Sequence, residues 1–494
     1  MKNYSFGNFI CELRMRRGLS QFQLGTLVGV SDKAVSKWEN GRAMPQLSRC
    51  QKLSDVLGVS IDDLLACKYQ QSTPVEKGVF AMKKVLWEKA SSRLTEVYGT
   101  VPPVPIAGRF ETEKMFMADS DLIIHLGFLS ELAAHFRKNN APFLCRGVLG
   151  GSFIAWLLGI TEVNPLAPHY FCEHCKTVEF HCDAVDGWDL PPKKCACGHM
   201  MYGDGHRLSF ESTFSHFSEV PSFDIDISPD CCELTDRLLR AYYADFFQVV
   251  QCMLPNLPQH TRYALIDFSE EIPYAASEWT WEAYMKEYFY RPRYTFIVST
   301  KMTILQELCR ATNRTPEHID FLAKEVLALY ERAEFPEFLA PGLRPIVEAY
   351  PPACFSDLLK AQGIKHASGK WDGKAFDDSI PFSQQIAFRD DVFDRVLSSM
   401  GDTGYTGNGL PLLVMNHTCR ARYARRGISP ELEALLLQMQ IPQEYINSLK
   451  KVLYLFPRAH SVAFLRADLM LSWFFVHEQA LLMRLVRTHL DPSV

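Results

Sequence analysis

Two carboxylates separated by one residue are the first feature of this 494-residue chain that could perform chemistry. They are Asp224 and Asp226, and the apolar residues around them are typical of a β-strand. Because side chains alternate along a strand, both carboxylates leave the same face, about 6–7 Å apart. Two cations that promote phosphoryl transfer need carboxylates at this spacing. The pair therefore predicts a Mg²⁺ site, with a solvated acidic strand face as the alternative.

Two short cysteine motifs predict a metal site of another kind. Cys172 and Cys175 are separated by two residues, and Cys195 and Cys197 by one. A structural zinc ion takes four thiolates from two such motifs. The second motif is one residue shorter than Cys-x-x-Cys, so another ligand could take part: Cys182, His174, His181 or His199. Free thiols are the alternative, since fifteen cysteines also fit a reducing compartment.

The charges of the chain are unevenly distributed. Residues 1–70 hold ten Lys and Arg against six Asp and Glu, whereas the remainder holds forty-two against fifty-one. This imbalance predicts that contact with nucleic acid is concentrated in the N-terminal segment. We find no charged-then-apolar leader and no apolar run near ~18 residues. We therefore expect a cytoplasmic protein with no membrane partner.

Residues 5–66 have the pattern of several short helices joined by turns. Phe6, Ile10 and Leu13 predict the apolar stripe of a first helix. The predicted boundaries are a stop at Gly18, a capping box from Ser20 to Gln23, a turn at Gly29-Val30, a cap at Ser31, and further helix starts at Pro45 and Ser60. Two helices across such a turn can place the second one in the major groove of DNA.

This region closely resembles the Cro/CI-type (XRE) helix-turn-helix family, most specifically in residues 14–46, which read RMRRGLSQFQLGTLVGVSDKAVSKWENGRAMPQ. The resemblance implies that Gln21 anchors a phosphate. It also implies that four residues reach bases or backbone: Asp32, Lys33, Ser36 and Lys37. The expected partners are double-stranded DNA and a second copy of the chain, because such domains usually bind as dimers. A protein-protein module of the same fold is the alternative.

A second resemblance covers most of residues 125–490. It is carried by RGVLGGSFIAWLLGITEVNPLAPHYFCEHC (146–175), VPSFDIDIS (220–228), FPEFLAPGL (335–343), IAFRDDVFDRVL (386–397) and SLKKVLYLFPRAHSVAFLRADLMLSWFFVH (448–477). These segments look like the palm and fingers of PolC-type bacterial DNA polymerase III alpha subunits. The resemblance implies catalytic roles for Asp224 and Asp226 and a zinc site in the cysteine insertion. It also implies a phosphate-binding loop made of Arg146, Gly150, Gly151 and Ser152.

Two departures from the PolC-type pattern bear most directly on catalysis. In the family a third carboxylate lies on a strand after the Ser277-Glu278-Trp279 marker. Here no acidic residue occurs between Glu287 and Glu307, and Thr295 to Ile297 fall at that position. The stretch from Ala244 to Gln259 is also shorter than in the family, and the lost segment would carry basic residues that bind the triphosphate. We therefore expect the polymerase-like region to be catalytically inactive.

The expected fold is multidomain. An all-α, five-helix helix-turn-helix domain (1–68) precedes a linker and helix (69–110), in which 101–105 form a stiff spacer. An α+β, nucleotidyltransferase-like palm (111–334) follows, with the cysteine insertion at 170–200. A mainly α-helical fingers region (335–494) completes the chain.

The function expected from these features is sequence-specific binding of double-stranded DNA by a transcriptional regulator. Its inactive polymerase-like region would serve as an interaction platform or a nucleotide sensor. One alternative is a minimal nucleotidyltransferase directed to DNA, with Asp267 or Asp230 as the replacement acid. Another is a protein that interferes with the replisome by binding replication proteins.

Overall fold

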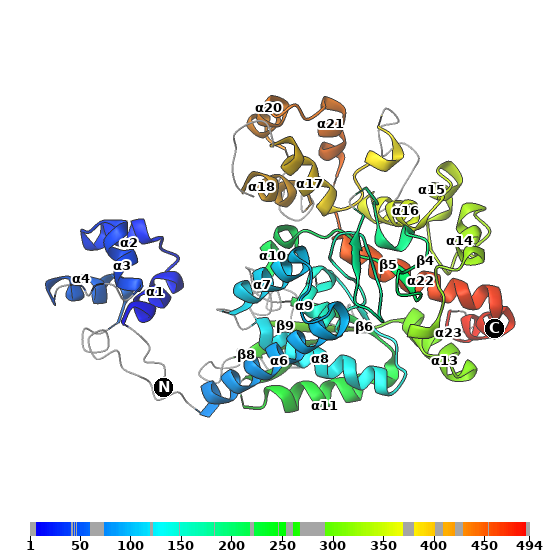
Figure 1. The fold of residues 1–494 in the computed structure, drawn as a ribbon, viewed down its shortest axis with the longest axis horizontal. Helices are drawn as coiled ribbons and strands as arrows, with labels where there is room; N and C mark the ends of the chain where they lie inside the picture. Colours follow the sequence, from blue (N-terminus) through cyan, green and yellow to red (C-terminus); the bar gives the residue numbers. More distant parts are fainter. Residues whose placement is uncertain are drawn as a thin grey trace. The chain divides into compact units, whose positions relative to one another are not determined.

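The computed structural model describes residues 6–40, 43, 45, 47–59, 74–118, 122–147, 149–181, 183–217, 222–245, 247–252, 260–266, 292–368, 380–400, 409–419, 428–452 and 454–490. The chain divides into two compact units, Met1–Ala81 and Met82–Val494. We call the first unit the head and the second the body. Figure 1 shows the helices and strands of each.

The described part of the head is a cluster of short helices: α1 (Phe6–Arg16), α2 (Gln21–Val28), α3 (Asp32–Glu39) and α4 (Leu47–Leu57). Their apolar sides share one core, which includes Ile10, Leu24, Val28, Val35, Trp38, Leu53 and Leu57. Burial of these side chains is the main contribution to the stability of so small a unit.

The predicted capping signals of the head are confirmed. The Ser20 hydroxyl accepts the Gln23 backbone N–H at 3.1 Å, and the Gln23 side chain accepts the Ser20 N–H at 2.7 Å. Ser31 caps α3 in the same way, by accepting the N–H of Ala34. Helix α4 begins at Leu47, later than the start predicted at Pro45. The fifth helix predicted after Ser60 lies outside the described residues.

A partly buried ion pair joins the first three helices of the head. Arg14 donates to the Glu39 carboxylate from Nε at 2.6 Å and from Nη2 at 3.0 Å. Gln21 Nε2 donates to the same carboxylate at 2.7 Å. Burial by itself would raise the pKa of Glu39, but these hydrogen bonds outweigh it and hold the pKa below its ordinary value. The carboxylate is therefore charged and stabilising at neutral pH.

A five-stranded sheet lies at the centre of the body, in the order β1-β6-β9-β8-β7. Its strands are β1 (Leu144–Cys145), β6 (Ser222–Ile227), β9 (Arg293–Val298), β8 (His260–Ile266) and β7 (Gln248–Cys252). β6 and β9 are parallel, and the other neighbours are antiparallel. The sheet therefore brings together segments that lie far apart in the sequence.

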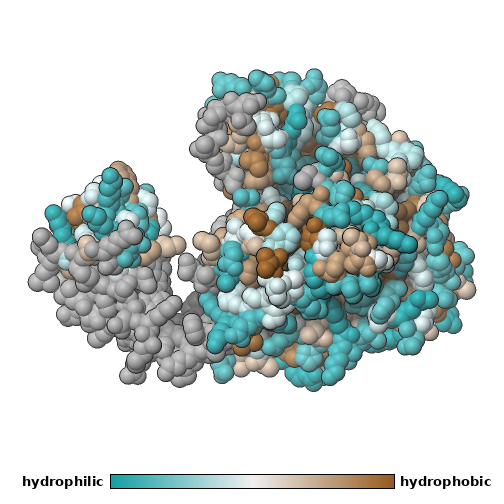
Figure 2. Space-filling model, viewed as in Figure 1, coloured by the Kyte–Doolittle hydropathy of each residue, from teal (hydrophilic) through white to brown (hydrophobic). Residues whose placement is uncertain are grey.

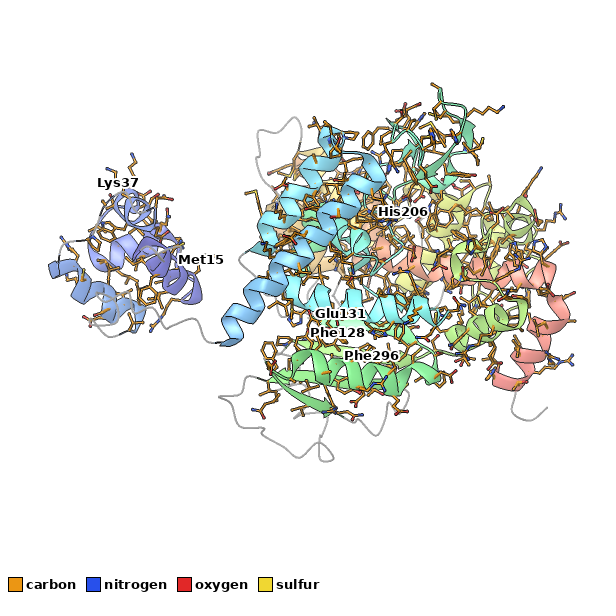
Figure 3. All side chains as sticks on the ribbon, turned by 60° about the horizontal axis from the view of Figure 1, so that its bottom comes forward. Met15, Lys37, Phe128, Glu131, His206 and Phe296 are labelled. Atoms are coloured by element: carbon orange, nitrogen blue, oxygen red, sulfur yellow. The ribbon has the colours of Figure 1, made fainter. Side chains whose placement is uncertain are left out.

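An aromatic layer covers one face of this sheet and packs it against α8 (Leu122–Lys138) and α11 (Cys232–Tyr243). The ring of Tyr294 lies 5.1 Å from the ring centroids of Phe128 and of Phe223. Figure 3 labels Phe128 on α8 and Phe296 on β9, two members of this layer. Because side chains alternate along a strand, Asp224 and Asp226 lie on the opposite face.

A second, four-stranded antiparallel sheet carries the cysteine motifs in its loops. Its order is β3-β2-β5-β4, with β3 (Val178–Phe180), β2 (His169–Phe171), β5 (Met200–Asp204) and β4 (Lys193–Lys194). Buried Asp186 attaches this sheet to the rest of the body. Its carboxylate lies 2.9 Å from His206 Nδ1 and accepts a hydrogen bond from Arg458 Nη2 at 3.2 Å.

Helices make up most of the body. The remaining ones are α6 (Pro74–Tyr98), α7 (Val104–Ala118), α9 (Phe153–Leu157), α10 (Phe210–Phe217), α13 (Thr300–Thr312), α14 (Lys324–Glu331), α15 (Arg344–Ala349), α16 (Phe355–Ser368), α17 (Arg389–Ser399), α18 (Gly409–Cys419), α20 (Pro430–Gln438), α21 (Gln443–Lys451), α22 (Arg458–His477) and α23 (Gln479–Leu490). Helix α7 begins at Val104, so the spacer predicted at 101–105 is shorter than expected, because Pro105 fits the first turn of a helix.

Two apolar cores organise the C-terminal helices. Helices α13 to α16 pack with α22 and α23 around one core, whereas α17, α18, α20 and α21 surround another. Figure 1 shows the latter four grouped at one end of the body. Among the described helices, α22 is the one long and apolar enough to cross a membrane, but 72% of its most apolar window is buried in the protein. The expected combination of an all-α N-terminal unit and a mostly helical α+β remainder is confirmed.

Replacing Glu39 by glutamine should destabilise the head by about 3 kcal/mol, because the half-buried Arg14 guanidinium would lose its counter-charge. In the full chain, hydrogen exchange of α1–α3 peptides through unfolding should then accelerate about a hundredfold. Exposed Lys52 on α4 gives the control Lys52→Gln. In the unmutated chain, the contribution of Glu39 is present above about pH 4.3 and is lost as the pH falls through its lowered pKa. Unchanged exchange in Glu39→Gln would contradict this role.

Candidate functional site

Helix α3 presents the predicted DNA-contacting side chains on one side and core residues on the other. Asp32, Lys33 and Lys37 are exposed and Ser36 is half-buried, whereas Val35 is fully buried in the core of the head. Figure 3 shows Lys37 pointing away from the helices of the head, and Figure 2 shows hydrophilic residues over this surface. The fold thus leaves a polar helix face that can approach a groove of DNA.

Gln21, the predicted phosphate anchor, is the first residue of α2 and is half-buried. Its side-chain nitrogen already donates to Glu39 at 2.7 Å. The amide has a second hydrogen, and the first N–H groups of a helix attract anions. A phosphate contact by Gln21 stays a prediction.

The sheet of the body holds Asp224 and Asp226 in register with the strands beside them. On β9, Asp224 lies opposite Thr295, and Asp226 lies opposite Ile297. In the described strands of this sheet, the pair supplies the only carboxylates. The strand beside the pair therefore presents a hydroxyl and an aliphatic side chain at the position where the PolC-type resemblance implies a third acid.

The next strand adds positive charge to the same face. On β8, Arg262 lies opposite Thr295, and His260 lies opposite Ile297. Arg262 is buried, and its Nη2 lies 2.5 Å from the Nδ1 of His260. Burial and the nearby arginines lower the pKa of His260, so its ring is neutral at pH 7. Sequence reasoning missed both residues because only the strand register places them beside the carboxylates.

Arg146 is bound to the carboxylate pair itself. Its guanidinium forms a two-pronged ion pair with Asp226, from Nε to Oδ1 and, at 2.8 Å, from Nη2 to Oδ2. Burial raises the pKa of Asp226, and the arginine offsets this only in part. The phosphate-binding role of Arg146 stays a prediction. In this structure its guanidinium is paired with one of the two expected metal ligands.

The predicted phosphate loop is occupied by another carboxylate. Glu113 of α7 is fully buried and accepts hydrogen bonds from the Ser152 hydroxyl and from the N–H groups of Phe153 and Ile154, at 2.9 to 3.0 Å. Gly150 and Gly151 are themselves buried. The phosphate-binding role of these loop residues stays a prediction, and Glu113 holds the donor groups that the role would use. No motif singled out Glu113 in the sequence.

A cavity of about 190 Å³ opens beside the carboxylates. Its lining includes Arg146, Gly147 and Asp224 from the palm-like part, and Asn416, Tyr454 and His460 from the C-terminal helices and their connections. The Gly147 N–H donates to His460 Nδ1 at 3.2 Å. Burial lowers the pKa of His460 far below its ordinary value, which leaves the neutral ring able to accept this hydrogen bond.

The four predicted cysteines converge at the end of the second sheet. Their sulfur atoms lie within 4.8 Å of one another. Two of the separations are 3.5 Å, between Cys172 and Cys197, and 3.4 Å, between Cys175 and Cys195. Tetrahedral zinc with Zn–S bonds of ~2.3 Å needs sulfurs ~3.8 Å apart. The cluster can therefore bind a metal such as zinc with small adjustments.

The local backbone explains why the short second motif suffices. Gly198 N–H donates to the Cys195 carbonyl, and Gly198 has φ 88°, which lets the chain turn tightly after Cys197. Of the substitute ligands, His199 and His174 stack on each other beside the cluster, with ring centroids 3.9 Å apart. Cys182 lies outside the described residues.

Comparisons with known proteins agree with this division of the chain. Residues 12–64 match the family described as Helix-turn-helix, and residues 82–253 match the Bacterial DNA polymerase III alpha NTPase domain. The chain is also similar to three PolC-type DNA polymerases III. The protein of Bacillus subtilis is 25% identical over 85% of this chain and 34% of its own length. Those of Lacticaseibacillus paracasei and Thermotoga maritima are 23% and 24% identical, over 84% and 78% of this chain and 33% of their own lengths.

The chain spans about a third of the length of the curated relatives it matches. The match to the polymerase domain includes the phosphate loop, the cysteine cluster and the carboxylate pair. The protein thus combines an XRE-type helix-turn-helix domain with a region homologous to PolC-type DNA polymerase III alpha subunits.

Proposed function

We propose that this protein is a transcriptional regulator that binds specific sequences of double-stranded DNA through its head. The observation that carries the proposal is α3, on which Asp32, Lys33 and Lys37 are exposed while Val35 and Trp38 belong to the core. The surplus of Lys and Arg in residues 1–70 supports it, because phosphate contacts supply much of the affinity for DNA. The proposal includes a homodimer, in which two heads meet successive half-sites, and a cytoplasmic location.

We infer that the body is an inactive descendant of a polymerase that serves as an interaction or nucleotide-sensing platform. Thr295 stands opposite Asp224, and Arg146 holds Asp226, so in the described strands of the sheet only the Asp224 carboxylate is left without a bound arginine for two metal ions. The open carboxylate of Asp224 and the neighbouring cavity support a weak nucleotide–metal site. They do not favour synthesis of DNA.

The alternative of a minimal nucleotidyltransferase needs a replacement acid. Asp230 follows β6, but its carboxylate accepts a hydrogen bond from Arg310 Nη1 at 2.9 Å. Asp267 lies beyond the residues that the structure describes. Of the two replacement acids, the one that the structure describes is thus paired with an arginine, which supports regulation over catalysis.

Exchanging both Lys33 and Lys37 for alanine should weaken binding of the full chain to duplex DNA at least tenfold at 0.1 M salt. The change removes two exposed cations from α3 and leaves its core side intact. Fluorescence anisotropy with a labelled duplex at several salt concentrations measures the effect. Lys52→Ala on α4 is the matched control. Equal affinity and equal salt dependence of the double variant and the unmutated chain would refute the assignment of α3.

The full chain should incorporate no labelled nucleotide into a primed template with Mg²⁺ or Mn²⁺, above the level of Asp224→Asn. Arg146→Ala should also stay inactive, because freeing Asp226 does not supply the acid that Thr295 replaces. Gel analysis of primer extension checks both statements. Incorporation that Asp224→Asn abolishes would establish the nucleotidyltransferase instead.

Protein purified without chelator should contain about one zinc ion per chain, held by the four-cysteine cluster. Cys172→Ser should lose most of this zinc, whereas Cys232→Ser, outside the cluster, should keep it. Elemental analysis by mass spectrometry measures the ratio. A content well below one zinc ion per unmutated chain would refute the zinc site. It would leave the proposed binding of DNA by the head unaffected.

A further inference from the structure

The exposed face of α3 carries lysine and aspartate side chains that can contact the edges of bases. Lys33 and Lys37 are both exposed and lie one helical turn apart, and exposed Asp32 precedes Lys33. In the major groove, a lysine pairs with the N7 and O6 acceptors of guanine, and an aspartate accepts from the N4 amino group of cytosine. These three side chains therefore complement the two bases of a G·C pair.

The amides that could read adenine are engaged within the head. Adenine is read by an amide that accepts from N6 with its oxygen and donates to N7 with its nitrogen, so both groups are needed. On α2, α3 and their caps, the amides are Gln21, Gln23 and Asn40.

In each of these amides, either the nitrogen or the oxygen already forms a hydrogen bond within the head. Gln21 Nε2 donates to Glu39 at 2.7 Å. Gln23 Oε1 accepts the Ser20 N–H at 2.7 Å, as part of the capping box. Asn40 Nδ2 donates to the Ser36 carbonyl at 2.8 Å. Two-point recognition of adenine by any of them would have to share a nitrogen or an oxygen that already forms a hydrogen bond within the head.

The apolar residues of α3 face the core of the head. They are Ala34, Val35 and Trp38, and all three pack against the core of the head. Recognition of thymine relies on apolar contact with its methyl group. Helix α3 thus has no exposed apolar side chain for thymine.

We propose that α3 reads G·C base pairs, with Lys33 and Lys37 on guanines and Asp32 on a cytosine. The inference rests on the proposed binding of DNA by the head. One helical turn is ~5.4 Å and base pairs are ~3.4 Å apart, so the guanines read by the two lysines lie about two base pairs apart. Asp32 adds discrimination, because a base edge that offers only acceptors repels a carboxylate.

Selection from a random duplex library with the full chain tests this inference. The expected result is an enriched half-site in which the positions under α3 are G·C pairs. Replacing one of these guanines by adenine should then weaken binding about tenfold. Lys37→Gln should reverse the preference at one position from guanine to adenine, because an uncommitted glutamine offers both groups that adenine needs. Lys52→Gln should leave the selected sequence unchanged.

The possible outcomes distinguish the preference for G·C pairs from the binding of DNA itself. An enriched site with A·T pairs under α3, or one that neither Lys37→Gln nor Asp32→Asn alters, would overturn the G·C reading while DNA binding by the protein stands. Failure to bind any duplex would instead overturn the proposed function. If Lys37→Gln does not fold, loss of cytosine preference in Asp32→Asn provides the same decision.

Discussion

The pairing of β6 with β9 determines what the body can do with its carboxylates. The parallel register places Thr295 beside Asp224 and Ile297 beside Asp226, and β8 then adds Arg262 to the same face. Two closely spaced acids repel each other unless cations neutralise them. In this structure a side chain provides that neutralisation, because Arg146 binds Asp226 from the loop after β1. This ion pair stabilises the charged carboxylate of Asp226 inside the sheet.

The head depends on an ion pair in a comparable way. Glu39, at the end of α3, accepts hydrogen bonds from Arg14 and from Gln21, which fixes α3 relative to α1 and α2. These hydrogen bonds fix which side of α3 faces the core, and the polar side stays exposed. The loss of catalysis that we propose for the body contrasts with the head, where α3 keeps an exposed polar face. This contrast is why we place the activity of the protein in the head.

Local signals in the sequence predicted the head well. The Ser20–Gln23 capping box, the Ser31 cap and the exposed side of α3 depend on neighbours within a few residues, and periodicity reveals them. The cysteine cluster was predictable for the same reason, since its spacing defines two turns. Asp224 and Asp226 were identified from strand alternation and from the family resemblance.

The sequence could not show how distant segments complete these sites. Arg262 reaches the carboxylate face only through strand register, and Glu113 fills the phosphate loop from a helix about forty residues earlier. The phosphate role of Arg146 stays a prediction, and its ion pair with Asp226 could not be foreseen, because a motif does not reveal which anions an arginine contacts. Such pairings depend on tertiary packing, which local pattern does not encode.

Hydrogen exchange of the full chain, with and without a saturating duplex, tests the central claim most directly. The account predicts slower exchange in residues 20–40, which contain α2 and α3, and no change in β6 or in the cavity-lining residues 454–460. Protection of β6 and residues 454–460, with α2 and α3 unaffected, would contradict it and place DNA recognition in the polymerase-like body.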